Sequence, residues 1–371
     1  MHRSGHKLLG LLFVVALVVF SHGGSYASGK KILFVNPGFA DKGFWHQVSA
    51  TMQAAADEFN YELIIVSADR DWQKMLSLGE AAINRENPDF LILVNENQKA
   101  PFLMDIANSK NIPTLLLLNT LTFEQQQTFG KPREKFKNWI GSITPDNEIA
   151  GFEMVWSLRE AARNHPASED GAIELISLVG DRDTPASIDR VQGLDRGLRL
   201  FSDITEKSRT VVNWSEDVAY GATKEWLNAH PLEAVWAAND PIANGAIRAM
   251  REKDLEPGED ILVAGLNWSI EAVRMVNSGE MTMTHGGHFL AGAWSIVLIH
   301  DFDQGRDFAA FDVNIMFPMS AIHKGNAAKY LSYFENRNWS QIPFKEFGLW
   351  DKQSDKQYDF TLDHILRLMN G

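Results

Sequence analysis

The stretch AVWAANDPIANGAIRAM, residues 234–250, contains the structural unit that recurs through most of the chain. It begins with a short, continuously apolar run, 234–238, that is typical of a strand buried on both faces. Asp240 and Pro241 then fit the N-cap and the first position of a helix, so residues 241–253 are predicted to be helical. A buried strand followed at once by a helix favours a parallel sheet with helices on both faces.

The same unit extends in both directions and divides the chain into two successive halves. In the first half, strands are predicted at 31–35, 61–67, 90–94 and 113–118, and helices at 44–59, 73–86 and 99–110. In the second half, strands are predicted at 172–179, 209–214, 234–238 and 261–266, and helices at 145–164, 187–201, 218–229, 241–253 and 268–278. The polar stretch 120–138 is interpreted as an insertion between domains. We therefore predict an α/β fold of two similar doubly wound parallel-sheet lobes, with ligand-binding loops at the carboxyl ends of the strands.

Composition excludes several classes of function. The chain has 371 residues, of which 45% are hydrophobic and 22% are charged, and this is enough for a large buried core. It has no cysteine, which excludes disulfides, a thiol nucleophile, an iron–sulfur cluster, a cysteine-ligated zinc site and a lipid-modified N-terminal cysteine. The formal net charge of −13 argues against a nucleic-acid-binding surface, because such a surface needs clustered Lys and Arg.

The first 27 residues have the features of a signal peptide. His2, Arg3 and Lys7 precede an apolar run at 8–20, which as a helix would span about 20 Å and so fall short of a bilayer core of about 30 Å. Small residues at Ser25 and Ala27 fit a cleavage site, and we place cleavage after Ala27. The alternative is an N-terminal membrane anchor. An exported chain without cysteine is predicted to reside in a bacterial periplasm.

Motifs that would identify an enzyme or a cofactor site are absent from the sequence. There is no P-loop, no G-x-G-x-x-G and no G-x-S-x-G. His285 and His288 could lie on one helix face as metal ligands, but the glycines between them favour a turn and no acidic third ligand is near. We therefore expect no metal, no cofactor and no catalysis. A periplasmic hydrolase on the same scaffold is the rival class.

The order of these elements resembles that of type 1 periplasmic binding proteins, which include the ribose, galactose and autoinducer-2 receptors. The resemblance covers about residues 31–318. It is carried by four short motifs that occur in the family's order and spacing: Phe44-Trp45 at the start of the first helix, Arg190-x-x-Gly193, Ala237-Ala238-Asn239-Asp240 followed by Gly245-Ala246, and Val263-Ala264-Gly265-Leu266-Asn267.

The resemblance implies two lobes joined by three crossover strands, which close like a hinge on a small polar ligand. The crossings are expected near 142–146, 284–287 and 317–320. The N-terminal lobe would then be 30–143 plus 286–317, and the C-terminal lobe 144–285 plus 318–371 with an extended tail. The aromatic residues of the tail are expected to pack against the body of the protein. A monomer is expected, since nothing in the sequence indicates oligomerisation.

The resemblance also implies which side chains bind the ligand. A sugar has apolar ring faces and a girdle of hydroxyls, which suit aromatic planes and planar hydrogen-bonding groups. The expected aromatic residues are Phe44 and Trp45 in the first lobe and Trp214 in the second, with packing in the core as their alternative role. The expected polar residues are Asn119, Arg190, Asn239, Asp240, Asn267 and His285, and weaker candidates are Asp41, Lys42 and Asn95.

Each polar candidate has a structural alternative. Asn119 could cap a loop, and Asp240 is expected to cap a helix with only partial ligand contact. Arg190 could form an ion pair with Asp183, Asp189 or Glu216. His285 could pack in the hinge.

The chain departs from the ribose binder, which has carboxylates where Asn119 and Asn267 stand here. A less anionic cleft makes a modified, oxidised or unusual polyol as plausible as a free hexose. The predicted function is capture of a sugar-like solute and its delivery to an ABC permease. The alternative is a receptor that presents its closed form to a membrane histidine kinase or chemoreceptor.

Overall fold

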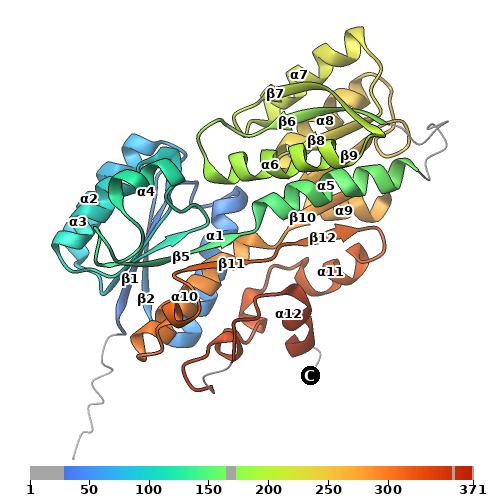
Figure 1. The fold of residues 1–371 in the computed structure, drawn as a ribbon. Helices are drawn as coiled ribbons and strands as arrows, with labels where there is room; N and C mark the ends of the chain where they lie inside the picture. The colour runs from blue at the N-terminus through green and yellow to red at the C-terminus, as the bar shows by residue number, and fades with distance from the viewer. Residues whose placement is uncertain (1–28, 164–172, 353–355, 370–371) are drawn as a thin grey trace, which may run out of the picture.

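The computed structural model describes residues 29–163, 173–352 and 356–369, which form two α/β lobes (Figure 1). The predicted signal peptide and its cleavage site after Ala27 lie outside the described residues. Within these described ranges, no helix has both the length and the apolar character needed to cross a membrane.

The first lobe is built on a six-stranded parallel sheet in the order β11-β5-β4-β3-β1-β2. Its strands are β1 (Lys31–Asn36), β2 (Glu62–Ser67), β3 (Phe90–Leu93), β4 (Thr114–Leu117), β5 (Trp139–Pro145) and β11 (Asn314–Phe317). Its helices are α1 (Gly43–Phe59), α2 (Trp72–Glu86), α3 (Ala100–Ser109), α4 (Phe123–Phe129) and α10 (Ala291–Asp303), with short 3-10 turns η1 (Glu96–Gln98), η2 (His288–Leu290) and η3 (Phe308–Ala310).

Alternate residues of each strand in this sheet face different helices. Ile32 and Phe34 of β1 belong to the apolar cluster that includes α1 and α10, whereas Leu33 and Val35 belong to the cluster that includes α2 and α3. Because both faces are covered, the strand has no polar face, and this explains why its sequence is a continuous apolar run.

The second lobe repeats this design with the strand order β12-β10-β9-β8-β6-β7. All its neighbouring strands are parallel except β10 and β12, which run antiparallel. Its strands are β6 (Ile173–Val179), β7 (Ile204–Val211), β8 (Ala234–Ala237), β9 (Leu262–Leu266), β10 (Met283–Gly286) and β12 (Ser320–His323). Its helices are α5 (Asn147–Ala162), α6 (Pro185–Leu200), α7 (Glu216–Ala229), α8 (Asp240–Glu252), α9 (Ile270–Ser278) and α11 (Ala327–Phe334).

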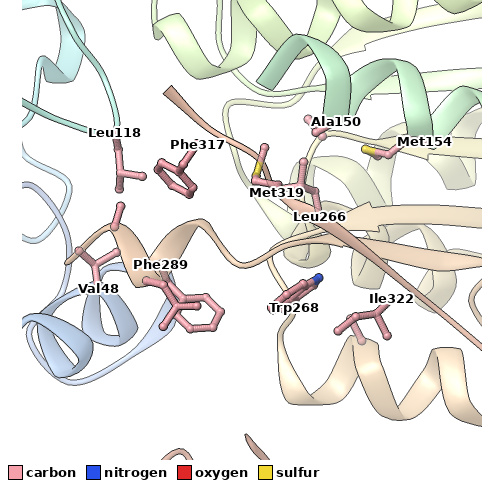
Figure 2. Close-up of a cluster of buried hydrophobic side chains, with 14 of the residues drawn as sticks. Val48, Leu118, Ala150, Met154, Leu266, Trp268, Phe289, Phe317, Met319 and Ile322 are labelled. Atoms are coloured by element: carbon pink, nitrogen blue, oxygen red, sulfur yellow. The ribbon is translucent and has the colours of Figure 1, made fainter. Parts of the chain in front are cut away.

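Three chain segments connect the lobes. The chain passes from β5 to α5, returns from β10 to α10 and passes again from β11 to β12. Apolar side chains from both lobes lie along these segments, among them Leu118, Leu266, Phe317 and Met319 (Figure 2). The structure confirms the predicted fold of two doubly wound lobes with a three-crossing hinge.

The stretch 120–138 is not an insertion between domains, as the sequence suggested, but part of the first lobe. It contains α4, which begins with a capping box formed by Thr122 and Gln125. Phe129 stacks on Phe136 with ring centroids 5.9 Å apart, and Phe136 is buried in the same cluster as Trp139. Many of the polar residues of this stretch therefore lie on a short amphipathic helix, which apolar contacts hold against the first lobe.

The C-terminal tail contacts both lobes, whereas it was predicted to belong to the second. The first part, α11, packs on α9, and Tyr330 makes an edge contact with Trp268 at 4.9 Å. The later part contains η4 (Trp339–Gln341), η5 (Phe344–Phe347) and α12 (Leu362–Met369). There the rings of Phe344, Phe347 and Phe360 surround Trp294 of α10 in the first lobe. The position of the tail differs from the prediction because the apolar surface against which these rings pack is on α10.

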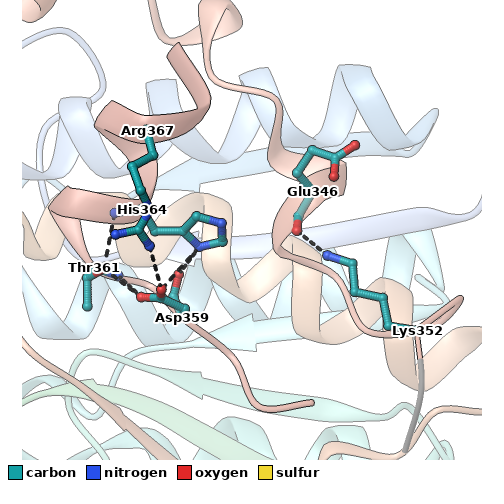
Figure 3. Close-up of polar contacts among 6 residues, drawn as sticks. All are labelled: Glu346, Lys352, Asp359, Thr361, His364 and Arg367. Atoms are coloured by element: carbon teal, nitrogen blue, oxygen red, sulfur yellow. Dashed lines mark hydrogen bonds and ion pairs between the residues drawn. The ribbon is translucent and has the colours of Figure 1, made fainter. Parts of the chain in front are cut away.

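Carboxylates hold the tail in place. Asp301 of α10 accepts hydrogen bonds from the backbone nitrogens of Leu349 (2.7 Å) and Trp350 (3.1 Å) and from the Tyr358 hydroxyl (2.7 Å). Within the tail, Asp359 accepts from Thr361, which precedes α12, and from Arg367 in the last turn of α12, as Figure 3 shows. The tail is therefore fixed to the first lobe by polar as well as apolar contacts.

Candidate functional site

A cavity of about 270 Å³ lies between the lobes, close to the lower limit of about 300 Å³ for typical small-molecule pockets. Both sheets direct the carboxyl ends of their strands toward it, so the loops that follow β1, β3, β4, β7, β8 and β9 contribute to its wall. Seven of the nine residues that the sequence singled out line this cavity: Phe44, Trp45, Asn119, Arg190, Trp214, Asn239 and Asn267.

The first lobe contributes aromatic rings at the start of α1. Phe44 and Trp45 meet edge to face with centroids 5.3 Å apart, and Phe44 stacks on His288 at 4.4 Å. The Cα of Gly38 approaches Trp45 so closely that a Cβ there would lie 2.3 Å from the indole, so only glycine fits in this loop. Trp45 is also buried with Val48 in the core, so it both lines the cavity and packs against the lobe.

The second lobe contributes Trp214, which lies in the loop after β7. Its backbone is left-handed, with φ 60°, and its Nε1 donates to Asp181 Oδ2 at 2.7 Å. The ring covers Gly180, where a Cβ would lie 2.3 Å from it. Burial acts to raise the pKa of Asp181, but hydrogen bonds from Thr184, Trp214 and the backbone together lower it, so this carboxylate is charged and holds the indole in place.

Arg190 of α6 is buried and points between the lobes. Nε donates to Asn147 Oδ1 (2.9 Å), Nη1 to the Ala238 carbonyl (2.8 Å) and Nη2 to His288 Nε2 (3.4 Å). Among the described residues it forms no ion pair with Asp183, Asp189 or Glu216, the alternative that the sequence left open. Burial lowers the pKa of Arg190 to about 10, against the opposing effect of nearby carboxylates, so the group remains cationic.

Three asparagines follow strand ends at the cavity. Asn119 Oδ1 accepts from the backbone nitrogen of Ala186 at 3.2 Å, which is a direct hydrogen bond between the lobes. Asn239 Oδ1 accepts from the backbone nitrogen of Ile242 at 2.9 Å and caps α8. Asn267 lies between β9 and α9 in an uncommon conformation, with φ 154°. The three amides therefore lie just beyond the carboxyl ends of β4, β8 and β9, and Asn239 also caps a helix.

Asp240 and His285 do not line the cavity. Asp240 is fully buried, accepts from Thr284 Oγ1 (2.7 Å) and from the Ser269 backbone (2.8 Å), and thus joins α8 to α9 and β10. The predicted N-cap was also wrong by one residue, because Asn239 occupies it. His285 lies in β10, with Nε2 2.6 Å from Glu153 of α5, so it contacts a hinge helix.

Four polar residues that line the cavity were not predicted as ligand contacts: Arg70, Glu96, Thr184 and His288. Glu96 follows β3, and its Oε1 lies 2.9 Å from Arg70 Nη1. Burial raises the pKa of Glu96, although Arg70 opposes the shift. His288 was considered only as a metal ligand, and its pKa is held well below 6.5 by burial and by Arg190, so the ring is neutral. Glu96 lies just beyond the end of a predicted strand. This position in the sequence could have identified it as a candidate for the cavity lining.

Of the weaker candidates, Lys42 lines the cavity and Asp41 does not. Asn95 is fully buried and donates to the Thr120 carbonyl and to Gln125, so it supports the loop instead. In the part of the chain that the structure describes, no group of three or more acidic or histidine side chains is arranged to hold a metal ion.

The buried carboxyl of Asp240 makes the stability of the protein depend on pH. Burial raises its pKa from 3.8 to about 6 despite hydrogen bonds that oppose the shift, so between these values the folded state binds more protons than the unfolded state. The contribution of this carboxyl to the free energy of unfolding is therefore lost as pH rises from 4 to 7. Asp240→Asn cannot ionise, so its stability relative to wild type should rise over this range by on the order of 2–3 kcal/mol.

Urea denaturation of both proteins at pH 4, 5, 6 and 7 measures this difference. Asp189, whose pKa is also raised to about 6, is present in both proteins and cancels. A stability difference that stays constant from pH 4 to 7 would contradict the assignment.

Comparison with known proteins relates this chain to periplasmic binding proteins. The family model described as a periplasmic binding protein domain matches residues 32–299. The ribose import binding protein RbsB of Escherichia coli is 23% identical over 280 residues, which cover 75% of this chain and 86% of that protein. The xylitol-binding protein of Mycolicibacterium smegmatis is 22% identical over 235 residues, or 63% of this chain and 61% of that protein. The crystal structure of a periplasmic sugar-binding protein from Pseudomonas fluorescens is similar with a TM-score of 0.81 and 30% identity, over 91% of this chain and 100% of that one.

Proposed function

The chain belongs to the periplasmic binding protein domain family, and from this premise we propose that it captures a sugar-like or polyol ligand between its lobes. The observation that carries the proposal is the cavity itself, where the rings of Phe44, Trp45 and Trp214 meet buried amides and a guanidinium. Rings suit the apolar faces of a sugar, and planar polar groups suit its hydroxyls. The names of the ribose, xylitol and sugar-binding relatives support the same ligand class.

We assign ligand contact to the seven predicted residues that line the cavity and add Glu96 and His288. Asp240 and His285 are assigned supporting roles, since they contact neighbouring elements instead. The protein would act in the periplasm as a monomer, without a cofactor and without altering its ligand.

Delivery depends on closure of the hinge. Asn119 bonds to Ala186, and Gln98 Nε2 donates to the Asp183 carbonyl at 3.4 Å, so the structure has the lobes in contact around the cavity. A ligand that contacts both lobes stabilises this form, and a membrane partner can then select it. The relative named for ribose import supports an ABC permease as that partner, and a membrane sensor would use the same surface.

The proposal is tested by thermal-shift screening of the chain without residues 1–27 against sugars and polyols. A true ligand at one hundred times its Kd should stabilise the protein by about 2.7 kcal/mol, and mass spectrometry should recover it unchanged. If no sugar or polyol stabilises the protein, or if the compound is converted, the proposal fails.

Trp214→Ala should weaken the confirmed ligand at least ten-fold, because stacking of an aromatic ring and the packing beneath it are both lost. Trp156→Ala is the matched control, since Trp156 lies on α5, is 49% exposed and does not line the cavity. Isothermal titration measures both affinities. Equal affinities of the Trp214→Ala protein and wild type would remove Trp214 from the site.

A further inference from the structure

The amides of the cavity offer more hydrogen-bond donors than acceptors. The side-chain oxygen of Asn119 already accepts from the Ala186 backbone, and that of Asn239 already accepts from the Ile242 backbone. A backbone N–H can only donate, so in both side chains the oxygen is the atom that is engaged. The Nδ2 group of each side chain therefore offers two hydrogens to a ligand, and each oxygen retains one lone pair.

Arg190 adds further donors and a positive charge. Three of its five N–H groups are engaged, by Asn147, Ala238 and His288, and one hydrogen remains on each terminal nitrogen. All three partners are neutral acceptors, so within the described residues this buried guanidinium bonds to no carboxylate. Since His288 Nε2 accepts from Arg190, that nitrogen is not free to accept from a ligand.

Acceptors are scarce by comparison. Glu96 is the one acidic side chain among the described residues that line the cavity, and one of its oxygens is paired with Arg70. Lys42, Arg70 and Arg190 make the lining cationic on balance. A neutral polyol brings a hydroxyl hydrogen for every oxygen and needs about as many acceptors as donors, which this lining does not supply.

We propose that the ligand is a monosaccharide-sized polyol that carries a carboxylate, such as an aldonate or a uronate, with the carboxylate bound by Arg190. The inference rests on the proposed function and narrows its ligand class. A carboxylate only accepts, matches the guanidinium geometry and gives the buried charge an ionic partner. The hydroxyls of the same molecule are then shared among Glu96, Asn267 and the two amide nitrogens.

A phosphate group fits this site less well than a carboxylate. Phosphates in α/β proteins usually bind free backbone amides at a helix N-terminus. Here the first-turn amides of α6 are engaged, Ala186 by Asn119 and Ser187 by the Thr184 carbonyl. The corresponding amide of α8, Ile242, is engaged by Asn239.

The test is isothermal titration at pH 7 with matched pairs: D-gluconate and D-glucitol, D-galacturonate and D-galactose, D-ribonate and ribitol. In at least one pair the acid should bind at least ten-fold more tightly than its neutral partner. Arg190→Gln should reduce that preference to less than three-fold. Arg196→Gln is the matched control on the same helix, because Arg196 is half-exposed and lies beside Glu148.

The outcomes separate the two proposals. If neutral compounds bind as tightly as their acids or more tightly, the carboxylate is excluded and the proposed function stands. If none of the compounds binds, and none in the wider sugar panel binds, both proposals fail. The comparison of acid with neutral compound uses the wild-type protein, so it remains decisive even if Arg190→Gln does not fold.

Discussion

Asp301→Ala should lower the free energy of unfolding by about 4 kcal/mol, the largest single loss that we expect from this structure. Asp301 is fully buried in the last turn of α10 and accepts from two backbone nitrogens and the Tyr358 hydroxyl. Burial raises the pKa of this carboxyl, although the same hydrogen bonds oppose the shift. Alanine would leave one buried and two partly buried donors without their acceptor.

Guanidinium denaturation measures the loss, and Asp351→Ala is the control because Asp351 is exposed two positions beyond Leu349. Limited proteolysis should also cut the Asp301→Ala protein first in the tail, since these bonds join the tail to the first lobe. Equal stability of the Asp301→Ala and Asp351→Ala proteins would show that the apolar contacts alone hold the tail.

Gly193→Ala should destabilise the protein by about 3 kcal/mol and weaken ligand binding at least ten-fold. Gly193 lies where α6 crosses α5, and a Cβ there would lie 2.0 Å from the backbone oxygen of Glu148. Gly151 makes the reciprocal approach from α5, with a Cβ position 2.1 Å from the Arg190 oxygen. Any side chain at Gly193 therefore forces the helices apart and moves Arg190, one turn earlier, away from its partners.

Gly221→Ala is a control with the same chemical change. Gly221 lies in α7, is exposed, and a Cβ there would meet nothing within 4 Å. Because alanine favours a helix over glycine, this variant should be more stable than wild type by up to about 1 kcal/mol. If both substitutions had the same effect, the close approach of α5 and α6 would not explain the Arg-x-x-Gly motif.

The fold could be predicted because its determinants are local. The apolar runs around Ile32, Phe90 and Val235 each specify a strand with two covered faces, and Asn239 caps the helix that follows the third of them. The three crossings of the chain between the lobes were predicted from the resemblance to the family. The position of the tail could not be predicted, because it depends on which lobe presents an apolar surface near the hinge, and Trp294 presents it from a helix far away in sequence.

The lining of the cavity was predictable for residues that follow the end of a strand. It was less predictable for residues whose side-chain direction depends on their partners. Asn119, Asn239 and Asn267 all follow strand ends and line the cavity. His285 and His288 are only three residues apart, but the first is held in β10 by strand pairing and the second follows the turn at Gly287 into the other lobe. Arg70 and Glu96 meet from two different strand ends, a pairing that no local pattern indicates.

The hydrogen bond that the Ala186 backbone nitrogen donates to Asn119 Oδ1 joins one lobe of the protein directly to the other. The ligand-free protein should therefore adopt the closed form for a small fraction of the time. The proposed membrane partner, if it recognises that form, should then show background activity in ligand-free cells. Loss of the bond in an Asn119 variant should lower that background, so this one amide would help to set the contrast between the ligand-free and ligand-bound states of such a partner.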